Sequence, residues 1–108
     1  MSGANVGGFN YTHLSGAATT TILAGVGASQ ATASSPANTG VLQDVVINTL
    51  GTTPVVTVYD GPNSSGSVVA IITPTAPGNQ FSSPIQLKSG LTVTVAGSAA
   101  TDVTVLWA

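Results

Sequence analysis

Ionisable side chains are scarce in this sequence. Among its 108 residues there is one lysine, Lys88, no arginine, no glutamate, and three aspartates, Asp44, Asp60 and Asp102. Charged residues make up 4% of the chain, whereas a typical soluble domain contains about 25%. Binding to nucleic acid and attraction to an anionic membrane both require several basic side chains, so the composition excludes both kinds of partner.

Cysteine is absent, and histidine occurs once, at His13. The absence of cysteine excludes disulfides and cysteine-ligated metals. One histidine without any glutamate does not fill a zinc site, and the three aspartates do not have the spacing of a calcium-binding EF-hand loop. We therefore expect neither a metal nor a cofactor.

The same shortage argues against an enzyme. A Ser-His-Asp arrangement would have to use His13, which lies in a weak strand near the N-terminus, and the sequence has no G-x-S-x-G motif. Glycoside hydrolysis would require two aspartates to converge, yet the three lie on separate strands and turns. Asp60 has a structural role instead, because it opens the turn "DGPN". We expect its side chain to bond its own backbone, and Gly61 to supply permissive dihedrals. We expect no catalytic residue.

Long apolar runs are missing as well. No stretch approaches the ~18 residues that a membrane-spanning helix needs. The start, "MSGANVGGFN", has neither the basic nor the apolar region of a secretory signal, so we predict none. The chain is nevertheless 43% hydrophobic with a net charge of −2, which is the reverse of a disordered composition. The length fits one domain.

Period-two alternation of apolar and polar residues dominates from about residue 41 onward. It is clearest at the C-terminal end, where the apolar positions are Leu91, Val93 and Val95, then Val103, Val105 and Trp107. Segments with strand character lie near 9–14, 19–24, 41–50, 53–61, 67–73, 80–87, 91–95 and 102–107. Since no segment has helical periodicity over ten residues, we predict an all-β fold, a β-sandwich or jelly roll of seven or eight antiparallel strands.

Three details of the strand prediction are specific enough to test. In "GVLQDVVINTLG", strict alternation places Leu42 on the opposite face from Val45 and Ile47. The short segments "KSG" and "AGSAATD" are predicted to close hairpins between successive strands. Pro84 makes its segment an edge strand or a bulged strand, because proline cannot donate a ladder hydrogen bond.

The predicted domain organisation is simple. Residues 1–8 are small and glycine-rich, which predicts a flexible N-terminal arm, and residues 9–108 form a single β-sandwich domain. Residues 25–40 form a long connection without a strand of their own.

Of the five aromatic residues, the three on clear strands, Tyr59, Phe81 and Trp107, are expected in the core. Phe9 and Tyr11 lie beside the arm, where they either close the sandwich or anchor the arm on a neighbouring molecule. With His13, for which we expect a surface or interface position, they are the candidate interface residues.

Residues from about 40 to 107 contain a series of recognisable short patterns. These are "L..VVINT", then "T.YDG....G..VA.I", then "F...I.LKSGL.V", and an aromatic residue near the end of the chain, Trp107. With these patterns the chain resembles a small β-sandwich family found among virion proteins of tailed bacteriophages. The ending "GSAATDVTVLW" is one residue off the commonest spacing of that family, which is a difference in a loop.

The resemblance implies a structural protein of the virion that is not an enzyme. Proteins of this kind decorate or cement the capsid surface, often as homotrimers, and bridge neighbouring subunits of the major capsid protein. An alternative from another class is a receptor- or glycan-binding module on a tail fibre or head spike. That alternative is motivated by loop tips rich in Ser, Thr and Asn, such as "DGPNSSG", and it predicts exposed aromatic residues among them.

Overall fold

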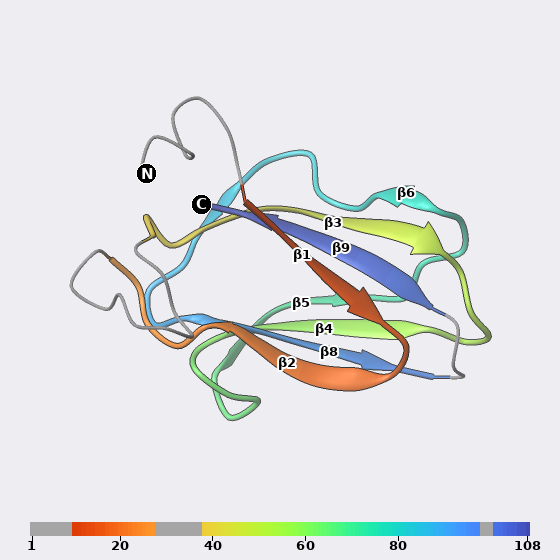
Figure 1. The fold of residues 1–108 in the computed structure, drawn as a ribbon, viewed down its shortest axis with the longest axis horizontal. Coiled ribbons are helices and arrows are strands. Elements are labelled where there is room, and N and C mark those ends of the chain that lie inside the picture. Colours follow the sequence, from red (N-terminus) through yellow and green to blue (C-terminus); the bar gives the residue numbers. More distant parts are fainter. Residues whose placement is uncertain (1–9, 28–37, 98–100) are drawn as a thin grey trace.

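The computed structural model describes residues 10–27, 38–97 and 101–108, which form two antiparallel sheets packed face to face (Figure 1). The first sheet has the order β1-β9-β3-β6, with β7 also paired to β3, and its strands are β1 (Asn10–Ser15), β9 (Asp102–Trp107), β3 (Val41–Thr49), β6 (Gly78–Asn79) and β7 (Ile85–Gln86). The second sheet has the order β2-β8-β4-β5, and its strands are β2 (Ala18–Leu23), β8 (Leu91–Ala96), β4 (Val55–Asp60) and β5 (Ser67–Ile72).

The predicted all-β sandwich of antiparallel strands is confirmed. The described residues form nine strands rather than seven or eight, because the segment around Pro84 contributes only the two-residue β7 and the equally short β6 precedes it. The predicted arm, residues 1–8, lies outside the described residues, as does most of the long connection between β2 and β3.

The core fills the space between the sheets and is made almost entirely of branched aliphatic side chains. Alternation in β8 and β9 places every second residue inward, as predicted for these two strands. Complete burial of one such side chain stabilises a fold by about 1.5–3 kcal/mol. The buried hydrophobic residues are Leu14, Ile22, Leu23, Leu42, Val45, Ile47, Val56, Val58, Ile72, Leu87, Leu91, Val93, Val95, Val103, Val105 and Trp107.

Strand β3 departs from strict alternation. Its register against β9 shifts between Leu42 and Asp44, which makes Gln43 an extra residue in the strand. A bulge of this kind reverses the facing of the residues before it. Leu42 is therefore buried together with Val45 and Ile47, and the prediction that it faces the other way was wrong.

The connections also differ from the predicted hairpins. Strands β7 and β8 lie in different sheets, and so do β8 and β9, so "KSG" and "AGSAATD" carry the chain from one sheet to the other. The short turn at Gly16 also crosses between sheets, from β1 to β2. The hairpin of β4 and β5 is the one pair of consecutive described strands hydrogen-bonded within a sheet.

The three aromatic residues expected in the core differ in how deeply they are buried. Trp107 is buried, and its ring N–H donates to Thr12 Oγ1 at 3.0 Å. Phe81 is half-buried and packs against the core. Tyr59 is also half-buried but lies on the outer face of the second sheet, between Thr92 and Val68 in the cross-strand register. The prediction of a core Tyr59 was therefore wrong.

Candidate interaction site

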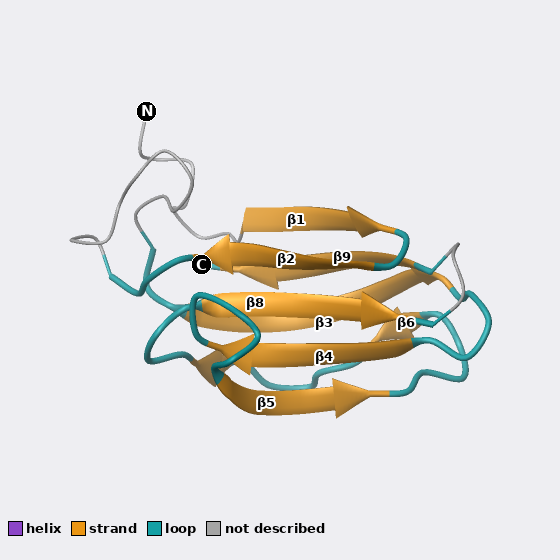
Figure 2. Ribbon diagram, turned by 90° about the horizontal axis from the view of Figure 1, so that it is seen from below, coloured by secondary structure: helices purple, strands orange, loops and turns teal. Residues whose placement is uncertain are grey.

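The two sheets expose edge strands on opposite sides of the molecule. Strand β1 ends the first sheet on one side, and β5 ends the second sheet on the other (Figure 2). Among the described residues, the large hydrophobic side chains that are mostly exposed are Tyr11 (73%), Val68 (54%) and Ile71 (65%). All three lie on these two strands. Exposed apolar side chains on an unpaired edge are typical of a surface that contacts another molecule.

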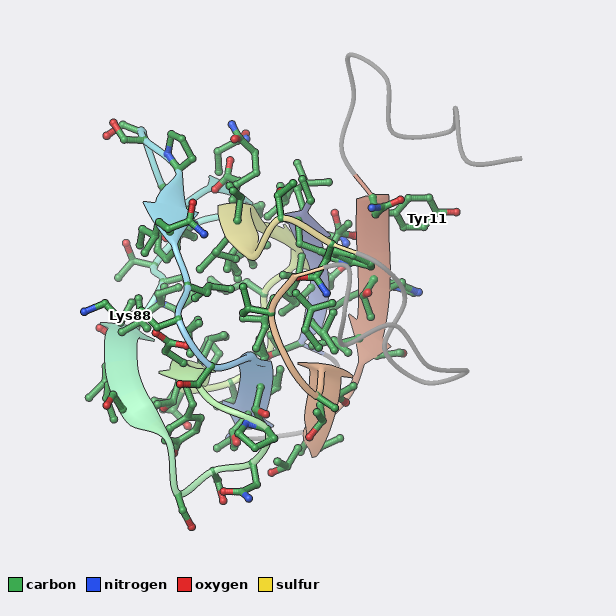
Figure 3. The ribbon with its side chains drawn as sticks, turned by 90° about the vertical axis from the view of Figure 1, so that its left-hand side faces the viewer. Tyr11 and Lys88 are labelled. Atoms are coloured by element: carbon green, nitrogen blue, oxygen red, sulfur yellow. The ribbon has the colours of Figure 1, made fainter. Side chains whose placement is uncertain are left out.

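Tyr11 is the clearest of the predicted interface residues. It lies opposite Leu106 of β9 in the register, on the outer face of the first sheet. Figure 3 shows its ring extending from β1 away from the body of the molecule. This position agrees with a contact on a neighbour and not with closing of the sandwich. Phe9, the residue predicted with it, lies outside the described residues.

Val68 and Ile71 were not predicted as interface residues. Strict alternation would place them on opposite faces, but the register of β5 against β4 is shifted at Val69. Val68 consequently lies opposite Tyr59, and Ile71 lies opposite Thr57, both on the outer face. The only sequence signal was that β5 is apolar at five successive positions, a pattern that does not distinguish an edge strand from an inner one.

His13 lies two residues after Tyr11 on the same face of β1. Its side chain is 52% exposed, and Nε2 lies 2.7 Å from Oδ1 of Asp102 on β9. Asn48 Nδ2 donates to the same carboxylate oxygen at 2.8 Å and to Thr104 Oγ1, also at 2.8 Å. The hydrogen bond from Asn48, followed by that from His13, lowers the pKa of Asp102 below its ordinary value of 3.8.

A histidine paired with a carboxylate is part of the usual apparatus of general-base catalysis. Here the pair lies on an open sheet face, and in the described part of the chain no serine or threonine hydroxyl bonds the His13 ring. Within those residues the arrangement has a base and its carboxylate but no nucleophile engaged with them. What this cluster does in the structure is fix the side chain of His13 against β9.

Asp60 holds two loops together at one end of the second sheet. Its carboxylate accepts the backbone N–H groups of Lys88, Ser89 and Gly90 at 2.8–3.3 Å. The prediction that Asp60 bonds its own turn was wrong. That local bond is made by Asn63 Oδ1, which accepts from the backbone N–H of Ser65 at 2.8 Å.

The hairpin that follows Asp60 folds over its own sheet. Thr92 Oγ1 on β8 donates to the Gly61 carbonyl at 2.9 Å, and Thr21 Oγ1 on β2 donates to the Pro62 carbonyl at 3.0 Å. Gly61 is required for close approach rather than for a left-handed backbone, because a Cβ there would lie 2.9 Å from Gly66 Cα. The tip itself, residues 62–65, is exposed.

Asp44 is the buried aspartate. Its carboxylate accepts the backbone N–H groups of Val45 (2.7 Å), Gln80 (3.2 Å) and Phe81 (2.9 Å), and the side-chain amide of Asn79 at 2.5 Å. It thereby secures the segment around β6 against β3. The three aspartates share no hydrogen-bonding partner, so none of the described carboxylates form a pair suited to glycoside hydrolysis.

The described residues contain neither a metal-binding cluster nor a membrane-spanning helix. Among these residues, His13 and the aspartates form no group of three close enough together to hold a metal ion. None of them forms a helix of the length and apolar character needed to cross a bilayer. No protein-family model, curated protein or solved structure matches the chain.

Proposed function

We propose that this chain is a structural protein of a tailed-phage virion, a capsid decoration or cement protein that binds the shell of major capsid protein and stabilises it. It acts without catalysis, at the capsid surface, as a homotrimer. The observation that carries the proposal is the pair of edge strands that expose apolar side chains and contain no lysine, arginine, aspartate or glutamate, on a molecule with very few charges. Residues from about 40 to 107 resemble virion β-sandwich proteins, and this resemblance is the reason for proposing the phage capsid as the assembly.

Two physical arguments support assembly as the role. Docking buries surface, and an uncharged surface has a small desolvation cost because no ion has to leave water. A net charge of −2 also gives little repulsion between copies packed at high density on a shell. Weak single contacts are then strengthened when one oligomer engages several shell subunits at once.

Binding to shells tests the proposal. Empty shells are assembled from the major capsid protein encoded by the same genome and centrifuged through a density gradient with and without the purified chain. We expect the chain to migrate with the shells and to raise the temperature at which they open. A chain that remains at the top of the gradient while the shells migrate normally contradicts the proposal.

One feature favours a second function, a receptor- or glycan-binding module. The exposed tip of the β4–β5 hairpin offers Asn63, Ser64 and Ser65 to a polar ligand. Against it, Trp107 is buried and Tyr59 is half-buried, so neither forms an exposed stacking platform at that tip. Binding of the chain to a glycan array, lost in the variant Asn63→Ala, would support this second function over the first.

A further inference from the structure

We infer that copies of this chain associate head to tail, with the β1 edge of one copy running antiparallel along the β5 edge of the next. The inference deepens the proposed function, on whose self-association it rests, by naming the surfaces that meet. It starts from the position of the apolar side chains. Tyr11 projects from one side of the molecule, whereas β5 with Val68 and Ile71 lies on the opposite side (Figures 2 and 3).

The two edges match in length and character. Each strand has six residues, and β5 contains neither a charged residue nor a proline, the side chains that usually protect an edge from pairing. Aligned antiparallel, Tyr11 lies opposite Ile71 of the next copy, and the bulge at Val69 brings His13 opposite Val68. All three exposed hydrophobic side chains are then covered by one type of contact.

Charge favours antiparallel over parallel alignment. Lys88, the only cationic side chain besides histidine, lies near the start of β5, because Asp60 binds its backbone N–H and pairs with Ser67 in the register. Its ammonium group has no ion-pair partner among the described residues. The Asp102 carboxylate lies beside the other end of the alignment, opposite Ser15 at the end of β1.

Antiparallel alignment brings the end of β1 to the start of β5, and so brings Asp102 of one copy towards Lys88 of the next. Parallel alignment would place Lys88 beside the uncharged start of β1. The Asp60 carboxylate near Lys88 is directed at the backbone N–H groups of the turn 88–90 and not at the Lys88 ammonium group.

An interface between two different edges has a consequence for assembly. A row of copies joined in this way has a free β1 edge at one end and a free β5 edge at the other. The copies therefore either close into a ring or grow into a filament. A β5–β5 contact between two copies would form a closed twofold dimer instead and would leave Tyr11 exposed. The two arrangements therefore respond differently to substitutions on β1.

Mixing two variants tests the inference by sedimentation velocity. Ile71→Lys blocks β5, and Tyr11→Lys blocks β1; both side chains are exposed in the single chain, so the core is unchanged. Val68→Lys is a second variant of β5. Thr52→Lys is the matched control, since Thr52 is an exposed residue in the connection between β3 and β4 and belongs to neither edge strand.

We expect the parent chain and Thr52→Lys to sediment as assemblies, and each edge variant alone to sediment as a single chain. An equimolar mixture of Ile71→Lys and Tyr11→Lys should form a species of two chains, because one intact β1 meets one intact β5 and the remaining edges are blocked. The inference is overturned if the mixture remains single chains over a concentration series, or if Tyr11→Lys alone keeps the mass of the parent.

The shell-binding experiment separates this inference from the proposed function. A chain that migrates with shells but fails the mixing test overturns the head-to-tail contact and leaves shell binding intact. A chain that passes the mixing test but ignores shells overturns the virion role and leaves the contact intact.

Discussion

Each of the three aspartates bonds a different part of the structure. Asp44 secures the segment 79–81, Asp60 secures the turn 88–90, and Asp102 orients His13 together with Asn48. In the first two cases one carboxylate accepts several backbone N–H groups, and leaving a buried group of this kind unsatisfied costs about 1–3 kcal/mol. The few acids of this chain thus hold loops and side chains in place.

The effect of Asn48 on Asp102 gives a prediction about pH. Removing the amide donor in Asn48→Ala should raise the pKa of Asp102 towards its ordinary value of 3.8, because the hydrogen bond to the ionised form is the largest cause of the lowering. A lowered pKa in the folded state means that ionised Asp102 stabilises the fold above the ordinary value, and that this contribution is lost as pH falls through the folded value.

The measurement is a titration of the Asp102 side-chain carboxyl ¹³C shift by NMR in both proteins. Asn63→Ala serves as the control, because its side chain bonds only within the β4–β5 hairpin. Identical Asp102 titration curves in the parent and in Asn48→Ala would contradict the role assigned to Asn48.

At the scale of elements, Gly61 and Gly66 form the neck of the β4–β5 hairpin, where the two sides of the turn lie close together. A Cβ at Gly66 would lie 2.7 Å from the Asp60 carbonyl oxygen and 2.9 Å from Gly61 Cα, which real side chains do not tolerate. Gly66→Ala should therefore lower the free energy of unfolding by about 2 kcal/mol through forced backbone movement. Denaturant unfolding measures this change.

Gly16 is the matched control for Gly66. It has a φ of +82°, but a Cβ at this position would meet no atom within 4 Å, so Gly16→Ala carries only the cost of a left-handed backbone, about 1 kcal/mol. If Gly66→Ala loses no more stability than Gly16→Ala, the hairpin neck is not constrained by close approach.

Sequence patterns predicted the elements better than their arrangement. Strict alternation in β8 and β9 was sufficient to predict their buried apolar side chains, because the apolar residues at every second position of each strand lie on the face that packs on the other sheet. The turns "KSG" and "AGSAATD" were misassigned as hairpins, since the same small and polar residues serve a return within a sheet and a crossing between sheets.

The candidate site was predictable only in part, for two physical reasons. Bulges at Gln43 and Val69 change which residues face outward, and neither has a distinctive residue type to mark it. The bonding partners of Asp60 and Asp102 come from distant parts of the chain, such as Lys88 and His13, and no local pattern reports them. Tyr11 could be named as a candidate but not placed, because an aromatic residue in a short polar strand can either close the sandwich or face a neighbouring molecule.

At the scale of the whole molecule, the near-absence of charge is the decisive property. Soluble proteins commonly remain apart partly through like-charge repulsion and charged edge strands. This chain has few charges with which to do either, and its exposed apolar side chains lie on edge strands at opposite sides. In the proposed assembly, self-association would cover those edges, and the assembled surface would present faces with few charges to a shell.

The most direct test of self-association is the mass of the parent chain in solution, measured by light scattering coupled to size-exclusion chromatography over a range of concentrations. We predict a closed assembly with three times the 10.5 kDa mass of one chain. A protein that elutes with the mass of a single chain at every concentration would contradict this prediction.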